Sequence, residues 1–152
     1  MSYATTTAFA ARLGPAIFLQ LTAEAGATEP DLGVAQGHLD TASAQIDVRI
    51  DARYVTPVAS PPQVIRRLAA LECDVATYYA WAYRGVKDSD NPATPMRDAA
   101  MKVLQDIQDA ELDLSGAPTR EMSDSSGAAS FGVFSETSRF NPPDSWGEDI
   151  FP

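Results

Sequence analysis

The run of residues that begins at Ser60 constrains the fold more than any other part of the chain. Ser60, Pro61 and Gln63 form a helix-start pattern, in which a serine caps the free amides, a proline takes the first helical position and a glutamine completes a capping box. The apolar residues that follow fall on more than one face of the expected helix: Val64, Ile65, Leu68, Ala69, Leu71, Cys73, Val75, Ala76, Tyr79 and Trp81. Such a helix needs cover on several sides, so we expect it at the centre of the fold.

Further helical segments are available to provide that cover. Short helices are expected over 5–13 and 16–21, and a long amphipathic helix over 31–53, where apolar residues recur every three or four positions. Thr94-Pro95 sets a cap and a first-turn proline for a last helix over 94–113. The residues expected on the buried edge of this last helix are Met96, Met101, Leu104 and Ile107. The predicted fold is therefore mainly α, a small helical bundle of four to five helices without a sheet.

The composition changes sharply near Leu114. Residues 115–152 hold eight Ser, four Gly and four Pro, and cannot build a core of their own. We therefore expect two parts, a helical body over 1–114 with a net charge of −6 and an extended, largely irregular C-terminal tail over 115–152 with a net charge of −4, in which 130–135 could supply one short strand. Large apolar side chains in an acidic tail suggest anchors for a partner surface. These candidate docking residues are Phe131, Val133, Phe134, Phe140, Trp146, Ile150 and Phe151.

Residues suited to catalysis or metal binding are scarce. The chain has one cysteine, Cys73, and one histidine, His38, which excludes an internal disulfide and a cysteine-cluster zinc site. His38 has no acidic or histidine partner three or four residues away, so we expect a surface histidine or one with its hydrogen bonds satisfied. Cys73 lies between two acids that raise a thiol pKa, and is expected to be a small core residue. We predict no catalytic, cofactor-binding or metal-binding residues, and no cofactor.

Two groups on the expected helices have a possible surface role. Asp47 and Asp51 lie one helical turn apart; a solvated face near arginines is the simpler interpretation, and a carboxylate pair for a cation or for acid–base work is the functional one. Tyr78, Trp81 and Tyr83 lie at the end of the central helix, where core packing is the simpler interpretation and a protomer contact the alternative.

Charge and hydropathy exclude several partners. The formal net charge is −10, whereas proteins that bind DNA or an anionic membrane surface usually have a surplus of Lys and Arg. The N-terminal residues have no basic segment before a long apolar run, and no stretch approaches the length of a spanning helix. We expect a protein of a reducing compartment that neither binds a membrane nor specifically binds DNA.

Two stretches resemble a known family. They are ASAQIDVRIDARYVTPV, starting at Ala42, and SPPQVIRRLAALECDVATYY, starting at Ser60. Together with the short segments around Tyr3, Gly14 and Leu19, they are similar to the Mu-type phage neck family, related in architecture to the head–tail connector or adaptor proteins of tailed phages. The resemblance covers roughly residues 3 to 113, and its motifs are structural rather than catalytic.

The resemblance implies a structural role in the virion neck. Such adaptors form a homo-oligomeric ring, commonly of twelve subunits, below the portal protein, where they extend the DNA channel and join the head to a stopper or tail-terminator protein. Assembly would take place in the host cytoplasm. DNA would pass through without being specifically bound, which suits an acidic protein. In such a ring, Asp47 and Asp51 are candidate channel-facing acids, and the candidate docking residues of the tail would bind the portal or a neighbouring subunit. The particle could be a phage or a phage-derived gene transfer agent.

Alternative functions remain open at this point. The nearest is a tail-completion or stopper neck protein. An alternative of another class is an acidic helical binding module, a DNA-mimic inhibitor that presents its carboxylates to a basic enzyme; an enzyme ranks third. The acids that such a mimic would use are Asp40, Asp47, Asp51, Asp106, Asp109, Glu111 and Asp113.

Overall fold

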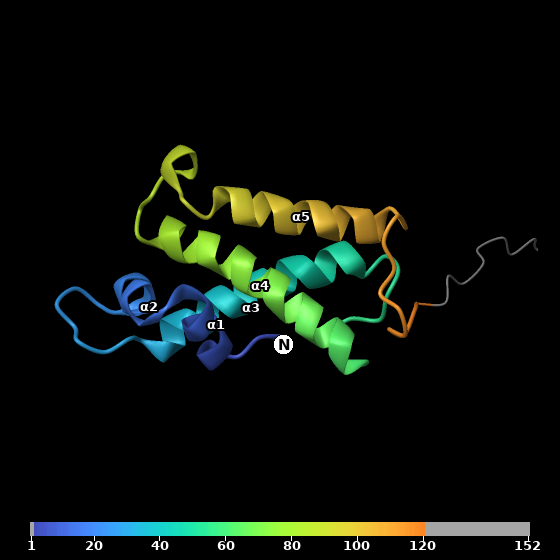
Figure 1. Cartoon of the computed structure of the whole chain (residues 1–152), viewed down its shortest axis with the longest axis horizontal. Helices are drawn as coiled ribbons and strands as arrows, with labels where there is room; N and C mark the ends of the chain where they lie inside the picture. Colours follow the sequence, from blue (N-terminus) through green and yellow to red (C-terminus); the bar gives the residue numbers. More distant parts are fainter. Residues whose placement is uncertain (1, 121–152) are drawn as a thin grey trace, which may run out of the picture. The chain divides into compact units, whose positions relative to one another are not determined.

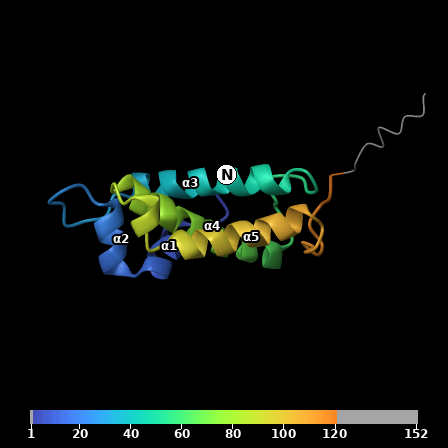
Figure 2. The ribbon, with the colours of Figure 1, turned by 90° about the horizontal axis from the view of Figure 1, so that it is seen from above.

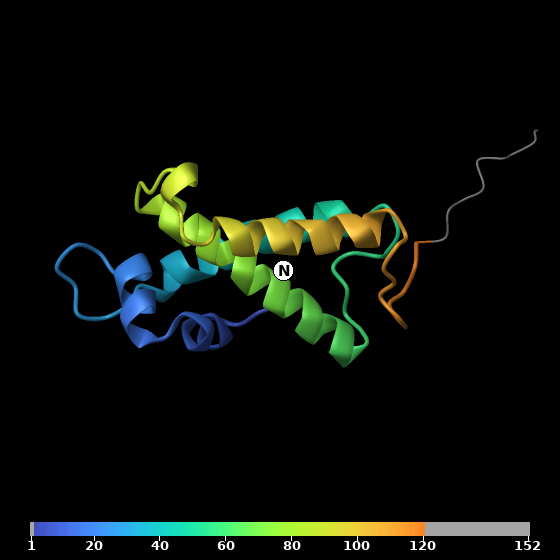
Figure 3. The same cartoon turned by 45° about the horizontal axis from the view of Figure 1, so that its top comes forward.

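The central element of the fold is helix α4, which packs against α3 and α5 and also contacts α1 and α2 (Figure 1). The computed structural model describes residues 2–120. Within that range the elements are α1 (Thr6–Leu13), α2 (Pro15–Thr22), α3 (Leu32–Ile50), α4 (Pro62–Tyr83), the short 3-10 helix η1 (Asp88–Asp90) and α5 (Thr94–Gln108). Viewed from above, α3 lies on one side of the bundle and α5 on the other (Figure 2), and α4 crosses α5 at an angle (Figure 3). The prediction of a mainly α bundle is confirmed.

Two helices begin at the polar residues that the sequence indicates. The Thr5 side chain accepts a hydrogen bond from Ala8 N at 3.1 Å at the start of α1. The Asp31 carboxylate accepts from Gly33 N at 2.7 Å and Val34 N at 3.1 Å at the start of α3. Each cap pairs amides that have no partner within the first turn of a helix.

The predicted capping box at Ser60 is wrong. The N-cap of α4 is Pro61, no side chain caps the helix, and Pro62 occupies the first turn. The reason is the second proline: the residue before a proline is disfavoured in helical conformation, and Pro61 accordingly has an extended ψ of 166°. The Pro61 carbonyl accepts the first helical hydrogen bonds, from Val64 N and Ile65 N.

The predictions for the start and buried edge of the last helix also need correction. The N-cap of α5 is Ala93, and Thr94 lies inside the helix, where its hydroxyl donates to the Asp88 carbonyl at 3.0 Å. Asn91 turns the preceding loop by accepting from Ala93 N, which shifts the cap by one residue. Met96, predicted to be buried, is 37% exposed, whereas Ala100 joins the buried edge. The long helices end earlier than expected, α3 at Ile50 and α5 at Gln108.

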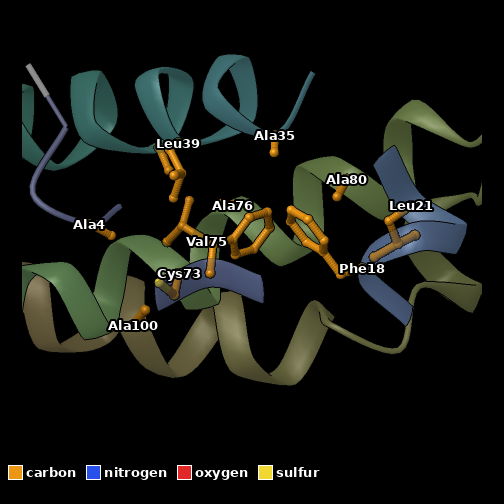
Figure 4. Packing of buried hydrophobic residues seen from close by; sticks show 12 residues of the cluster. Ala4, Phe18, Leu21, Ala35, Leu39, Cys73, Val75, Ala76, Ala80 and Ala100 are labelled. Atoms are coloured by element: carbon orange, nitrogen blue, oxygen red, sulfur yellow. The ribbon is translucent and has the colours of Figure 1, made fainter. Parts of the chain in front are cut away.

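The interior consists of two hydrophobic clusters. The first core cluster lies where α1 and α2 cover α3 and α4, and many of its members are alanines (Figure 4). In it, Leu39 points from α3 toward Val75 on α4, and the rings of Phe9 and Phe18 meet edge to face at 5.9 Å. The second core cluster contains larger aliphatic residues at the other end of the bundle. It comprises Ile46, Ile50, Tyr54, Val58, Val64, Leu68, Leu104, Ile107, Leu114 and Ala117.

The second core cluster extends past the predicted end of the body. Leu114 and Ala117 are buried in it, so residues 115–120, which the sequence assigns to the tail, contact the helices. The division at residue 114 stays a prediction, and the structure adds packed residues up to 120. Among the helices described, none combines the length and apolar character needed to cross a membrane.

Candidate assembly surfaces

A buried carboxylate fastens the first residues to the bundle. Glu72 on α4 is 0% exposed and accepts hydrogen bonds from Ser2 Oγ at 2.5 Å, Tyr3 N at 2.7 Å and Ala4 N at 2.6 Å. Burial raises the pKa of Glu72, while these three donors act in the opposite direction by stabilising the charged form. We call residues 2–4 the N-terminal strap.

The hydroxyl of Tyr3 joins this strap to two further elements. It donates to the Asp47 carboxylate on α3 and accepts from Val58 N at 3.1 Å. Burial, together with the hydrogen bond to Asp47, raises the pKa of Tyr3, so the hydroxyl stays protonated as a donor. The strap thus connects α4, α3 and the loop between them.

A second strap lies at the end of the described chain, over residues 114–120, and we call it the C-terminal strap. Its backbone pairs antiparallel with the segment after α3: Val55 N donates to the Pro118 carbonyl and Arg120 N to the Arg53 carbonyl, both at 2.9 Å. The Arg120 guanidinium donates to both oxygens of Asp51, at 2.8 and 2.9 Å.

A buried tyrosine fixes the beginning of the C-terminal strap. The hydroxyl of Tyr54, which is fully buried, donates to the Asp113 carboxylate and accepts from Leu114 N at 2.9 Å. Burial and the bond to Asp113 raise the pKa of Tyr54. Arg53 adds a bond to the Ile107 carbonyl at 2.6 Å, which ties the end of α5 to the same place.

Asp47 and Asp51 therefore each hold one strap. Both are half-buried, Asp47 on α3 and Asp51 at its C-cap, and their partners are Tyr3 for Asp47 and Thr56 and Arg120 for Asp51, rather than the neighbouring arginines. Arg49 instead donates to Gln105. Whether the two acids face a channel stays a prediction, but the charge of Asp51 is already paired with Arg120.

The aromatic group at the end of α4 divides between core and surface. Trp81 and Tyr79 pack against the first core cluster, whereas Tyr83 is 65% exposed. Tyr78 is half-buried, and the Arg97 guanidinium lies over its ring at 4.0 Å. A protomer contact through Tyr78, Trp81 and Tyr83 stays a prediction.

The histidine and the cysteine are both buried. The prediction of a surface or satisfied histidine is wrong: His38 is 9% exposed, and its Nε2 has no hydrogen-bond partner among the described residues. Its ring meets the Tyr83 ring edge on at 5.4 Å, and burial, together with the charge of Arg84, lowers the pKa of His38. Cys73 is buried in the core as expected, and burial raises its pKa to about 11. No cluster of potential metal ligands occurs within residues 2–120.

Exposed apolar side chains border two separate hollows. The first, which we call the Trp81 groove, has a volume of about 240 Å³ and includes the exposed residues Ile17 and Met96. The second, which we call the α3 face, has a hollow of about 570 Å³ beside Val48, which is 78% exposed. The Trp81 groove is lined by Arg12, Leu13, Ile17, Thr77, Trp81, Pro92, Ala93 and Met96, and the α3 face by Thr41, Ala44, Gln45, Val48, Arg49 and Met101. The two share no residue.

Two further pockets flank the start of α4. Pocket A, of about 170 Å³, is lined by Ser2, Tyr3, Pro57, Val58, Ala59 and Ile65. Pocket B, of about 270 Å³, is lined by Gln63, Val64, Arg67, Asp113, Leu114 and Ser115. Each strap forms part of one pocket, so the polar contacts that hold the straps also shape this surface.

Sequence reasoning missed both straps, although one signal for them was present. Glu72 follows Leu68 by four residues and precedes Val75 and Ala76 by three and four, so it lies on the apolar face of α4. A carboxylate at such a position requires hydrogen-bond donors. The candidate tail residues Phe131, Val133, Phe134, Phe140, Trp146, Ile150 and Phe151, and the possible strand over 130–135, lie outside the described residues.

Several of the acids that a DNA mimic would use accept hydrogen bonds from other residues of the chain. Asp40 accepts from Gln36, Asp109 from Gln105, and Asp113 from Tyr54 and Arg53. These contacts compete with the presentation of free carboxylates to a basic partner.

One comparison with known proteins gives a match. A family model with the description "Bacteriophage Mu, Gp36" matches residues 3–133, which includes all five α-helices and both core clusters. No curated protein sequence matches the chain.

Proposed function

Because the chain belongs to the family described as Bacteriophage Mu, Gp36, and is thus a phage structural protein, we propose that it is a head–tail connector. In this role its copies form a ring below the portal, extend the DNA channel and join the head to the stopper or tail. The role is structural and needs no catalytic group. As a phage structural protein the chain is a component of the virion, and the proposal assigns it to the neck.

The observation that supports the ring is the presence of two different apolar surfaces on one body. A ring forms when one surface of each subunit binds a different surface of the next, so each subunit needs two unlike patches. The Trp81 groove is concave, with Ile17 and Met96 at its exposed edge, and the α3 face presents Val48. Single exposed apolar residues are common on monomers, so the support comes from the hollow at each surface together with its exposed apolar side chains.

The two straps support the connector role in a second way. They bind the segments before α1 and after α5 to α3 and α4 by hydrogen bonds. The residues that follow 120, with the aromatic candidates, therefore start from a defined point on the body. A connector needs this combination of a defined body and a segment that reaches another component.

The charge of the chain is compatible with DNA passage. The net charge is −10, and a surface that repels phosphate does not retain DNA as it moves. Under this proposal, the lumen of the assembled ring has a negative potential. A basic lumen in the assembled ring would contradict this part of the proposal.

Assembly of surface variants tests the ring. We expect the full chain, mixed with its portal, to form rings in electron microscopy and light scattering. Val48→Glu and Met96→Glu should each prevent ring formation, because each places a charge in one apolar surface. A mixture of the two variants should stop at dimers, since one intact groove and one intact α3 face remain. Leu32→Glu is the matched control, because Leu32 is 57% exposed and lies on neither surface.

Two outcomes would refute this interface. One is normal rings from both glutamate variants. The other is a loss of assembly with Leu32→Glu that equals the loss with Val48→Glu. Absence of any portal-dependent assembly of the unmodified chain would refute the connector role itself.

Truncation tests the role of the tail, and the structure sets where to cut. A stop after Gly116 would remove Ala117, which is buried, and Arg120, which pairs with Asp51, so it would disturb the body as well. A stop after Arg120 retains the C-terminal strap. We expect this variant to keep its thermal stability but to fail to join heads to tails; normal joining would refute a docking role for the tail.

A further inference from the structure

The one histidine of the chain lies in an unusual setting for a polar side chain. His38 on α3 is 9% exposed, and its Nε2 has no hydrogen-bond partner among the described residues. A buried polar atom without a partner is unfavourable and is rare in folded proteins. An apolar ring at the same position would avoid that penalty. Packing alone therefore does not account for an imidazole at position 38.

A tyrosine and an arginine from the end of α4 adjoin this imidazole. The rings of His38 and Tyr83 meet edge on, with 5.4 Å between their centroids. The Arg84 guanidinium lies over the same Tyr83 ring, 5.9 Å from its centroid. The Tyr83 ring thus contacts both side chains, and the permanent charge of Arg84 acts on His38.

Arg84 also fastens the end of α2. Its Nε donates to the Leu21 carbonyl at 3.0 Å, and a second guanidinium nitrogen donates to the Ala23 carbonyl. Carbonyls at the end of a helix have no partner within the helix, and a cation is favourable there. Residues 24–30, which join α2 to α3 at one end of the body, are all exposed (Figures 1 and 2). Arg84 is therefore the polar attachment of this end of α2 to α4.

The charged groups around His38 leave Arg84 as its charged neighbour. Helix α2 (Pro15–Thr22) contains no titratable side chain. Asp40 lies two residues after His38 and thus about 200° around α3, where it accepts from Gln36. Glu24, in the loop after α2, is exposed. Other charges on the surrounding elements are bonded elsewhere: Arg12 to Asp74, Arg97 to Asp88 and Asp98, and Asp31 to the amides of Gly33 and Val34.

A proton on His38 is disfavoured while this arrangement is closed. Burial, together with the charge of Arg84, lowers the pKa of His38 from its ordinary value of 6.5. The closed arrangement thus binds the proton less tightly than an opened one in which His38 meets water. Its stability is fully present above the ordinary pKa and is lost as pH falls through the lowered value. The proton would place a second cation beside Arg84, on an atom without a partner among the described residues.

Helix α2 is the element that should yield. It has eight residues, whereas α3 has 19 and α4 has 22, and a helix of eight residues depends on contacts with the rest of the fold. Its last carbonyls are bound by the same arginine that a charged His38 would repel.

We propose that His38, Tyr83 and Arg84 form an acid-sensitive latch, in which protonation of His38 releases Arg84 from the carbonyls of Leu21 and Ala23 and frees the end of α2. Residues 24–30 are freed with it. Because α2 supplies Ile17 to the Trp81 groove, the same proton alters the shape of that groove. The latch goes beyond the proposed function, since it operates within one chain and needs no ring.

Nuclear magnetic resonance of the full chain tests the latch. The chain has one histidine, so its ring signal needs no further assignment. We expect His38 to titrate below pH 6.5. Hydrogen exchange of the Ala23 amide, which bonds to the Leu19 carbonyl at 2.9 Å, reports the end of α2. Between pH 7.5 and 5, its protection should fall by up to about tenfold per pH unit, the slope of a single proton, after correction for the intrinsic exchange rate.

A second amide and two variants make the test specific. The Val55 amide, which bonds to the Pro118 carbonyl at 2.9 Å, is the control for unfolding of the whole body, and its protection should not fall with that of Ala23. His38→Phe keeps an aromatic ring beside Tyr83 but cannot titrate, so protection at Ala23 should no longer depend on pH. Arg84→Gln should lower protection at Ala23 at every pH and raise the midpoint of the His38 titration toward 6.5.

Four results would each overturn the proposal. They are a His38 titration at or above its ordinary pKa, protection at Ala23 that is independent of pH in the unmodified chain, the same loss in acid with His38→Phe, and an equal loss at Val55. The first, second and fourth are measured on the unmodified chain, so they hold even if a variant does not fold. None of them depends on assembly, so a failure of the latch is distinct from a failure of the connector role.

Discussion

Both straps fix a segment outside the helices to the bundle, but they use different polar groups to do so. Each has a tyrosine hydroxyl that donates to an aspartate and accepts from a backbone amide: Tyr3 with Asp47 and Val58, and Tyr54 with Asp113 and Leu114. The N-terminal strap is also held by the fully buried carboxylate of Glu72. The C-terminal strap is also held by the exposed ion pair between Arg120 and Asp51 and by a short antiparallel backbone contact. From this comparison we expect the burial of the polar group, rather than the number of its hydrogen bonds, to decide how much each strap contributes to stability.

The largest effect is expected from Glu72→Ala, which breaks the N-terminal strap. The variant leaves the Tyr3 and Ala4 amides without their buried acceptor and opens a cavity in α4, so we expect a loss of about 3 kcal/mol in the free energy of unfolding. Urea denaturation followed by circular dichroism measures it. Asp74→Ala is the matched control, because Asp74 lies two residues away in a partly exposed pair with Arg12. An equal loss of unfolding free energy in the two variants would contradict the expectation that a buried polar group contributes more than an exposed one.

The tyrosine variants compare the two straps directly. Tyr54→Phe should cost about 1–2 kcal/mol, because the buried Leu114 amide loses its acceptor. Tyr3→Phe should cost less, since Tyr3 is half-buried. Hydrogen exchange locates each effect: faster exchange at Leu114 is expected for the first variant and at Val58 for the second. Faster exchange at both amides in either single variant would show that the straps are coupled and not separate.

A dependence on pH is expected for the N-terminal strap. Because burial raises the pKa of Glu72 in the folded state, the folded chain holds that proton more tightly than the unfolded chain. The part of the stability that is linked to this proton, as distinct from the hydrogen bonds that Glu72 accepts, is thus fully present below the ordinary pKa of Glu72 and is lost as pH rises through the raised value. Glu72→Gln removes this titration, so the free energy of unfolding of the unmodified chain should rise relative to that of the variant as pH falls through that window. A difference that stays constant with pH would contradict this assignment.

The smallest effect is expected from Arg120→Ala in the C-terminal strap. Exposed ion pairs contribute about 0–1 kcal/mol and weaken in salt. The loss should be about 0.5 kcal/mol at low ionic strength and should shrink at high salt, whereas the loss from Glu72→Ala should not change. Thermal unfolding at two salt concentrations provides the measurement. A salt-independent loss from Arg120→Ala would show that the backbone pairing, rather than the ion pair, depends on Arg120.

The helices were predictable because their signals are local. The Thr5 and Asp31 caps, the stop at Gly14 and the apolar periodicity of α3 all lie within a few residues of the structure that they specify. The prediction of Ser60 as the N-cap of α4 also used a local signal, but it was wrong. Two adjacent prolines offer two possible helix starts, and only the conformation of Pro61 decides between them.

The straps were not predictable in the same way. Tyr3 and Asp47 are 44 residues apart, and Arg120 and Asp51 are 69 apart, so no local pattern connects them. The Trp81 groove depends on how α1, α2 and α5 meet around α4, which periodicity does not specify. For this reason, Asp47 and Asp51 were recognised as a pair but not with their partners.

The C-terminal strap also determines how the body bears mechanical load. The chain beyond Arg120 is connected to Asp51 and Arg53, at the end of α3, before it reaches α5. A pull on that chain is transmitted first through the ion pair and the two backbone hydrogen bonds to α3, one of the two longest helices of the bundle. In the proposed role, tension from a partner that holds the tail would therefore pass to α3 first, and the end of α5 at Gln108 would bear less of it.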